Sequence, residues 1–154
     1  YNNSIREVPS SIGKLQALRE LALHNNKLQS LPRDLGRLVM LETLFLDNNN
    51  IVELGFDLCA LTNLTDLGLN NNGLAALPLG LVNLGCLMTL DLTRNRLHEL
   101  PPSIQGLTLL NSLQLCNNSL NELSPLIGNL TSLTLLTLDN NALESLPESL
   151  GALT

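Results

Sequence analysis

Aromatic residues are scarce in this sequence of 154 residues. It has no tryptophan, one tyrosine and two phenylalanines, whereas 44% of its residues are hydrophobic. Any buried core must therefore consist mainly of aliphatic side chains. No apolar run reaches the roughly 18 residues of a membrane-spanning helix, and no basic-then-apolar leader is present. We therefore predict no membrane span.

Basic residues are also few. Eight lysines and arginines stand against 14 aspartates and glutamates, which gives a net charge of -6. Proteins bind nucleic acid largely by neutralising phosphates with lysine and arginine. The composition therefore argues against a nucleic-acid partner and favours a protein partner that carries a basic patch.

Cysteine is present in an odd number. Cys59, Cys86 and Cys116 form no C-x-x-C pair, and three cysteines cannot be a complete disulfide set. Free thiols are typical of proteins in a reducing compartment. We therefore expect a cytoplasmic location.

Motifs of catalysis and metal binding are missing. The sequence has no P-loop, no G-x-G-x-x-G, no G-x-S-x-G and no His/Cys cluster at metal-ligand spacing. His24 has Asp47 in the next repeat, but no hydroxyl is placed to complete a hydrolytic triad. Asp47 and Asp139 are too far apart in the repeat order to share a Ca²⁺ ion. We therefore predict no enzyme, no cofactor and no metal site.

Leucine, in contrast, is abundant and regularly spaced. The frame L-x-x-L-x-L-x-x-N-x-L begins at Leu18, Leu41, Leu64, Leu87, Leu110 and Leu133, that is, every 23 residues. We assign residues 1–154 to one domain, which has a partial repeat at 1–17, full repeats at 18–40, 41–63, 64–86, 87–109 and 110–132, and a last repeat at 133–154. Because the chain opens in mid-repeat, we expect it to be a fragment of a larger protein.

Each repeat predicts a short strand, a turn and a short helical segment. The L-x-L step alternates inward and outward residues, as a half-buried strand does. An asparagine then recurs in every repeat and can satisfy backbone groups where the chain turns inward; the copies are Asn3, Asn26, Asn49, Asn72, Asn95, Asn118 and Asn141. Proline at 9, 32, 78, 101 and 147 suits the first residue of a helical turn. Gly55 replaces it once, and there we expect a different conformation.

These features define the predicted fold class as an α/β solenoid. Parallel strands need a crossover to return to the same edge, and the helical segment supplies it. We predict an arc with a concave parallel sheet and short α- or 3-10 helical segments on the convex side.

The repeat resembles the leucine-rich repeat family along essentially the whole chain. The ending L-P-x-x-L-G-x-L is most similar to the intracellular subgroup that contains the Ras-suppressor protein and the Scribble and Erbin scaffolds. This resemblance implies a scaffold or adaptor in signalling that binds another protein. Two alternatives are a ligand-sensing receptor-type domain and a structural segment, in which uncapped ends would drive end-to-end self-association.

The candidate binding surface follows from the outward positions of the concave sheet. Neighbouring repeats should place them in columns, about 4.8 Å apart. The columns carry five acids and no base, with Arg94 at the rim. The predicted partner-binding residues are Glu20, His24, Thr43, Phe45, Asp47, Asp66, Asn70, Asp91, Thr93, Arg94, Gln114 and Asp139.

Phe45 is the leading candidate for a partner contact on this surface. It has the small residues Ala22 and Gly68 as column neighbours, so its ring is expected to project from the sheet. Binding energy at interfaces concentrates in a few aromatic or arginine anchors. We therefore place Phe45 at the centre of an acidic recognition patch; the alternative is that its ring merely covers the sheet above Gly68.

Overall fold

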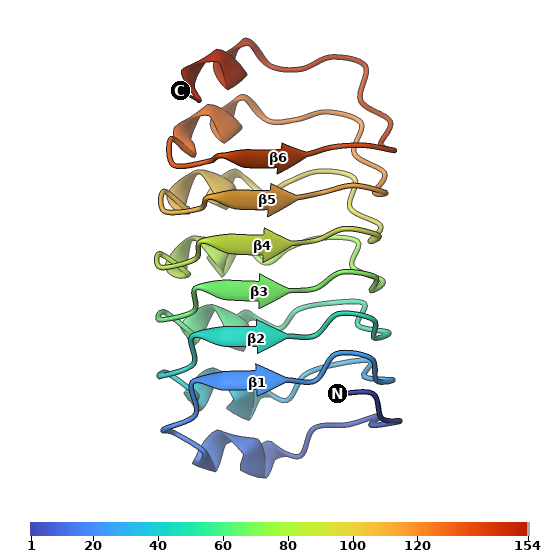
Figure 1. Ribbon diagram of the computed structural model, residues 1–154, viewed down its shortest axis with the longest axis vertical. Helices are drawn as coiled ribbons and strands as arrows, with labels where there is room; N and C mark the ends of the chain where they lie inside the picture. The colour runs from blue at the N-terminus through green and yellow to red at the C-terminus, as the bar shows by residue number, and fades with distance from the viewer. Residues whose placement is uncertain (154) are drawn as a thin grey trace.

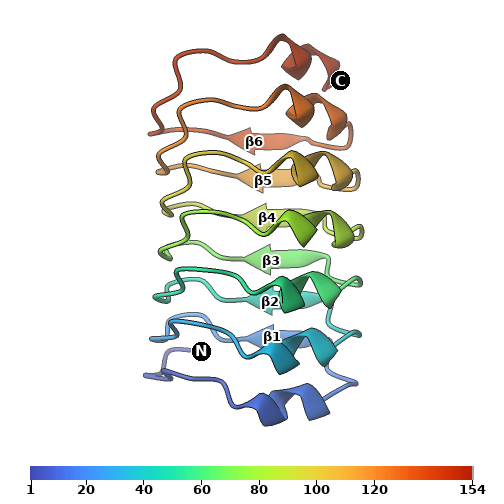
Figure 2. The ribbon, with the colours of Figure 1, turned by 180° about the vertical axis from the view of Figure 1, so that it is seen from behind.

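Each repeat forms one coil of a curved stack in the computed structural model, which describes residues 1–153. The strands are β1 (Glu20–Ala22), β2 (Thr43–Phe45), β3 (Asp66–Gly68), β4 (Thr89–Asp91), β5 (Ser112–Gln114) and β6 (Leu135–Thr137). The convex segments are the 3-10 helices η1 (Ser10–Lys14), η2 (Arg33–Arg37), η3 (Phe56–Ala60), η4 (Leu79–Asn83), η5 (Pro102–Gly106), η6 (Pro125–Asn129) and η7 (Glu148–Ala152). Figure 1 shows the strands on the near side, and Figure 2 shows the 3-10 helices behind them.

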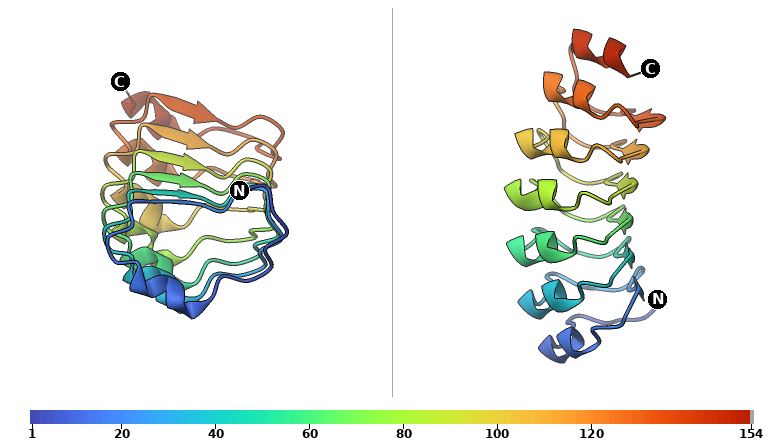
Figure 3. Two further views of the ribbon diagram at one scale, coloured as in Figure 1. Left: turned by 60° about the horizontal axis from the view of Figure 1, so that its bottom comes forward. Right: turned by 90° about the vertical axis from the view of Figure 1, so that its left-hand side faces the viewer.

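The strands form one parallel sheet in chain order. Glu20 pairs with Thr43, Thr43 with Asp66, and the same register continues to Leu135. Every strand thus sits beside the equivalent residues of its neighbours, which confirms the predicted solenoid. Seen edge-on, the sheet and the row of 3-10 helices are two separate layers (Figure 3, right).

Leucine fills the space between these layers. The core is a single cluster in which almost every member is leucine, together with Ile51, Ile104 and Ile127. Side chains of the first and last coils, such as Ile5 and Leu150, are only partly buried. This difference is expected, because an internal coil packs on two neighbours and a terminal coil on one.

Proline lies one residue earlier in the convex segments than we predicted. Pro32 and Pro78 are the residues before the 3-10 helix, with φ of -71° and -67° and extended ψ of 146° and 142°. Proline fits because its ring fixes φ near -65°. Gly55 adopts the same conformation, with φ -63° and ψ 150°, so the prediction that this segment differs was wrong. The surrounding coil determines the path there without proline.

Close approach between convex segments explains the recurrent glycine. A Cβ at Gly36 would collide with the carbonyl oxygen of Asp57 in the next coil. In the following coil Cys59 takes the place of this glycine, and its sulfur faces Gly80, where an added Cβ would lie 3.0 Å from Sγ. In the first contact the glycine belongs to the earlier coil (Gly36), and in the second it belongs to the later coil (Gly80).

The repeated asparagine connects successive coils inside the structure. Asn95 is 8% exposed. Its Oδ1 accepts a hydrogen bond of 3.0 Å from the backbone N–H of Leu74, and its Nδ2 donates to the carbonyls of Leu69 and Leu92 at 2.9 and 3.0 Å. Equivalent bonds recur at Asn26, Asn49, Asn72, Asn118 and Asn141. This is the predicted structural ladder.

Candidate functional site

The concave sheet places the predicted site residues in three columns. Strand pairing puts Glu20, Thr43 and Asp66 in the first column, and Phe45, Asp91 and Gln114 in the second. The third column continues beyond the strands, where backbone bonds link each coil to the next, as in Asn25 N–H to Asp47 O at 2.8 Å. It contains His24, Asp47, Asn70, Thr93 and Asp139. The structure therefore brings the central members together, while Glu20 and Asp139 lie exposed towards the two ends.

Three rings form an aromatic row beside the hollow described below. The ring of Tyr1 stacks on that of His24, with centroids 4.6 Å apart and planes 11° apart. The His24 ring meets Phe45 edge to face, with centroids 6.3 Å apart and an 81° angle. Phe45 is therefore half-buried, and His24 supports it although the small Ala22 is its strand neighbour. Such pairs add to stability beyond the area they bury.

Gly68 forms the floor of a hollow in the middle of the sheet. The hollow has a volume of about 190 Å³ and is lined by Phe45, Asp47, Asp66, Leu67, Gly68, Thr89, Asp91 and Gln114. A Cβ at Gly68 would collide with the Asp47 carboxylate. Since a water molecule occupies about 30 Å³ in the liquid, the hollow has room for the end of one long side chain.

Two of the aspartates are held by Asn70. Oδ1 of Asp47 accepts a 2.9 Å hydrogen bond from the backbone N–H of Asn70. The Asn70 side chain donates to Oδ2 of Asp91 at 3.3 Å, and Oδ1 of Asp91 accepts from the backbone N–H of Thr93 at 2.9 Å. Both Asp91 oxygens are thus occupied. Oδ2 of Asp47 has no hydrogen-bond donor among residues 1–153.

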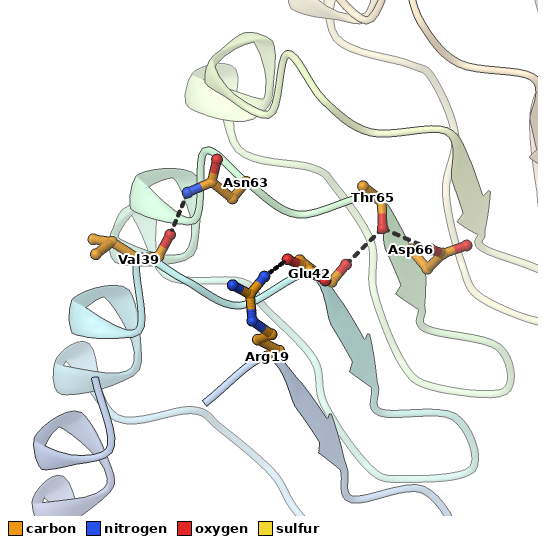
Figure 4. A network of polar contacts seen from close by, with 6 residues as sticks. All are labelled: Arg19, Val39, Glu42, Asn63, Thr65 and Asp66. Atoms are coloured by element: carbon orange, nitrogen blue, oxygen red, sulfur yellow. Dashed lines mark hydrogen bonds and ion pairs between the residues drawn. The ribbon is translucent and has the colours of Figure 1, made fainter. Parts of the chain in front are cut away.

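The side chain of Asp66 is oriented by Thr65, the residue just before strand β3. The Thr65 hydroxyl lies 2.7 Å from Oδ2 of Asp66 and 2.9 Å from the carbonyl oxygen of Glu42 (Figure 4). A hydroxyl has one proton, so it serves these two acceptors in turn. In the same network Arg19 forms an ion pair with Glu42. Oδ1 of Asp66 accepts no hydrogen bond from the described part of the chain and is available to a ligand.

Burial raises the pKa of Asp47 above its ordinary value. Desolvation is the main cause, and the nearby Asp91 charge adds to it, while the hydrogen bond from Asn70 and the proximity of His24 act in the opposite direction. Because the folded-state pKa is the higher one, Asp47 favours folding most at low pH. That contribution is lost as the pH rises through the raised pKa.

Asp47→Asn should therefore change how stability depends on pH. The amide oxygen can keep the bond from Asn70, but the side chain no longer ionises. We expect the free energy of unfolding of the wild type, relative to this variant, to fall as the pH rises from below the ordinary aspartate value of 3.8 through the raised pKa of Asp47. Urea denaturation of both proteins at several pH values measures this difference. Parallel pH profiles would contradict the assignment.

Arg94 lies in a left-handed backbone conformation. Its φ is 55°, and the equivalent residues Asn2, Asn25, Asn48, Asn71, Asn117 and Asn140 have φ between 53° and 56°. Asparagine tolerates this region far better than other non-glycine residues do. Some of these asparagines also bond to each other, as Asn71 Nδ2 does to Asn48 Oδ1 at 2.9 Å. Arg94 interrupts this outer row.

Arg94→Asn is expected to raise the free energy of unfolding by about 1 kcal/mol, because it removes the strain of arginine in the left-handed region. Thermal and urea denaturation measure the gain. Arg96→Asn, two residues further on and without a positive φ, is the control and should leave stability nearly unchanged. Equal effects at the two positions would be evidence against backbone strain at Arg94.

Several residues of the hollow and of the aromatic row were not among the predicted site residues. Tyr1, Gly68 and Thr89 contribute to the aromatic row or the lining. The column sequence Phe45, Gly68, Asp91 was a usable signal, since a glycine between two larger outward residues leaves a gap. Cys116, which lies between Thr93 and Asp139 in the third column, donates from Sγ to Oδ2 of Asp139 at 3.2 Å.

Within residues 1–153, no group of three or more His, Cys, Asp or Glu side chains is placed to hold a metal ion. No helix in this range is long and apolar enough to cross a bilayer.

Family models now define the class of protein. A model described as a leucine-rich repeat region matches residues 56–154, and a leucine rich repeat model matches residues 1–51. The chain therefore belongs to the leucine-rich repeat family, whose domains are typically binding modules and generally non-catalytic. No curated protein sequence matches the chain.

Solved structures of longer leucine-rich repeat proteins share this fold. A leucine-rich repeat protein from Leptospira interrogans is 32% identical with a TM-score of 0.77, over 99% of this chain and 45% of that one. The ectodomain of the plant membrane receptor kinase GASSHO1/SCHENGEN3 from Arabidopsis thaliana, in complex with CASPARIAN STRIP INTEGRITY FACTOR 2, is 34% identical with a TM-score of 0.87, over 99% of this chain and 19% of that one. The plant peptide hormone receptor RGFR1, in complex with RGF2, is 34% identical with a TM-score of 0.85, over 96% and 24%.

Proposed function

We propose that this chain is a protein-recognition module that holds an extended segment of a partner on its concave face. In this proposal one lysine or arginine of that segment enters the hollow above Gly68. The observation that carries the proposal is the hollow itself, which combines an aromatic wall with two carboxylate oxygens that lack internal donors, Oδ2 of Asp47 and Oδ1 of Asp66.

A cationic side chain suits each part of the hollow. Ammonium and guanidinium groups donate hydrogen bonds to carboxylates, and such charge-assisted bonds are the stronger ones. The Phe45 ring forms part of the wall, and aromatic faces attract cations. The bonds from Asn70 and Thr93 hold Asp47 and Asp91 in place before binding. Such preorganisation lowers the entropy lost on association.

The solved relatives support a binding role. The GASSHO1/SCHENGEN3 and RGFR1 structures each contain a bound ligand. This chain spans only 45%, 19% and 24% of the three relatives described above. Any function that we give to the complete protein is therefore also a proposal.

For the cellular setting, we propose a cytoplasmic scaffold or adaptor of the Ras-suppressor and Scribble–Erbin type. The support is the set of free thiols, of which Cys59 is buried. Burial raises the pKa of the Cys59 thiol, with the Asp57 charge as a smaller cause, so this thiol is poorly reactive. Mass spectrometry of the protein from its native source, denatured directly in an alkylating agent, tests the location: three alkylated thiols support it, and a disulfide or a glycosylated asparagine contradicts it.

The second candidate is a segment of a ligand-sensing receptor. It is favoured by the 34% identity to two plant receptors. Cell-surface labelling of the native protein distinguishes it from the cytoplasmic scaffold.

The binding proposal is tested with peptides selected from a random display library by the wild-type chain. Fluorescence polarisation then measures their affinities. We expect the selected peptides to share a lysine or arginine, and its replacement by norleucine or citrulline to weaken binding about tenfold or more. Binding should also weaken as salt rises from about 0.05 to 0.5 M.

Variants of the chain locate the contact. Asp47→Asn with Asp66→Asn removes charge from the hollow with little change in shape, because each amide keeps one oxygen for the existing donor, and Phe45→Ala removes its wall. Both should weaken binding about tenfold or more. Glu99→Gln with Glu122→Gln removes the same charge outside the concave columns and is the matched control. Selected peptides without a basic residue, or equal losses in the control, would refute the proposal.

A further inference from the structure

The most exposed large apolar side chains lie on the convex side, away from the hollow. Leu79 is 72% exposed and Phe56 is 68% exposed, and each begins its 3-10 helix. The equivalent residues of the next two coils, Pro102 and Pro125, are also exposed and apolar. Four successive coils thus present an apolar row, which we call the convex row: Phe56, Leu79, Pro102 and Pro125. The row of 3-10 helices that carries it faces away from the sheet (Figure 3, right).

Opposite charges border the two ends of the convex row. The equivalent position is Arg33 in the coil before Phe56 and Glu148 in the coil after Pro125. Both side chains are exposed, and neither forms an ion pair with another residue between 1 and 153. At this one position of the repeat, the order along the convex side is therefore positive, four apolar residues, negative.

The whole chain has the same polarity. Six of the eight basic residues lie in the first 37 positions. No lysine or arginine follows Arg96, whereas five acidic residues do: Glu99, Glu122, Asp139, Glu144 and Glu148. One end of the arc is thus basic and the other acidic.

We propose that the convex row is the contact surface of an antiparallel dimer with a second copy of this chain. A two-fold axis between Leu79 and Pro102 places each residue of the row opposite its counterpart counted from the other end. Phe56 then faces Pro125 of the second copy, Leu79 faces its Pro102, and Arg33 faces its Glu148. An isologous contact of this kind is self-complementary, as a closed dimer requires.

The curvature of the arc is consistent with this arrangement. Two convex surfaces touch near the two-fold axis and diverge from it. The apolar residues occupy the middle, and the long side chains of Arg33 and Glu148 lie where the gap is wider. The hollow of about 470 Å³ beside Phe56 is lined by Arg33 but also by Glu53 and Asp57, so we place the contact between Arg33 and the second copy's Glu148 outside it.

A second copy explains the surface better than an unrelated partner does. The charge order of the convex row is complementary to itself when reversed, and so is the charge order of the full arc. A parallel pairing would place Arg33 against Arg33 and Glu148 against Glu148. The dimer leaves the concave hollow free, so it is independent of the proposed peptide binding.

Sedimentation equilibrium of the full chain between about 10 µM and 1 mM tests the proposal. We expect a monomer–dimer equilibrium that weakens from about 0.05 to 0.5 M salt. Leu79→Ser with Phe56→Ser should raise the dimer Kd about tenfold or more. Phe45→Ser on the concave face is the matched control and should not change it. Circular dichroism checks that each variant is folded.

Charge reversal at Arg33 and Glu148 distinguishes antiparallel from parallel pairing of the two copies. Arg33→Glu alone and Glu148→Arg alone should each weaken the dimer, because like charges then face each other. An equimolar mixture of the two variants, or both substitutions in one chain, should restore it. A chain that stays monomeric, single reversals without effect, or a mixture that does not recover would overturn the proposal. Open-ended larger species would assign the contact to the ends of the arc instead.

Discussion

Asn95→Ala is expected to lower the free energy of unfolding by about 3 kcal/mol, which is a large part of the stability of a domain this size. The substitution removes the partner of the Leu74 N–H and of the Leu69 and Leu92 carbonyls. These groups are buried, so they lose their hydrogen bonds unless water enters the core, and either outcome lowers the stability. Because the bonds join two coils, the loss weakens both a coil and its interface.

Urea denaturation monitored by circular dichroism measures the Asn95→Ala effect. Asn50→Ala is the matched control, because Asn50 is exposed and its side chain forms no hydrogen bond with residues 1–153. The control should change stability by less than about 0.5 kcal/mol. Similar losses for both variants would show that the ladder contributes little.

Gly36→Ala should cost about 2–3 kcal/mol, the usual range for overpacking at a site that cannot relax. The new methyl group would collide with the carbonyl oxygen of Asp57 and lie 3.1 Å from its carbonyl carbon. Both atoms belong to the backbone, so relief requires that the coils separate.

Gly85→Ala is the contrasting substitution for Gly36→Ala. A Cβ at Gly85 meets nothing within 4 Å, and the residue has no positive φ. We expect this variant to be unchanged or up to about 1 kcal/mol more stable, because alanine restricts the unfolded chain. Chemical denaturation of both variants gives the comparison. A destabilised Gly85→Ala, or a neutral Gly36→Ala, would refute the steric explanation.

The architecture and the columns were predictable because the 23-residue period leaves no choice of register. Once Leu21 and Leu44 occupy equivalent inward positions, Ala22, Phe45 and Gly68 must share an outward column. The ladder was predictable for the same reason, since one amide recurs at one place in every coil. A period determines backbone neighbours directly.

Side-chain directions were less predictable. The contact between His24 and Phe45 joins different columns and depends on the rotamers of both rings. Asp47 lies across Gly68 because the Asn70 N–H attracts its carboxylate, which the column order does not reveal. Gly55 misled us in the opposite way: a missing proline indicated a changed conformation, but packing on the adjacent coils restores the usual one.

The exchange of Cys59 and Gly80 restricts which coils can be neighbours. Loss of residues 18–40 would bring Gly13 next to Asp57, a glycine–aspartate contact like those of Gly13 with Asp34 and Gly36 with Asp57. A tandem duplication of residues 41–63 would instead bring Cys59 of one copy next to Asp57 of the next, whose carbonyl oxygen leaves no room for a Cβ at Gly36. In an evolutionary lineage that gains and loses repeats by recombination, the deletion is sterically acceptable and the duplication needs a compensating substitution. Although the units look interchangeable, their order is inherited together with their contacts.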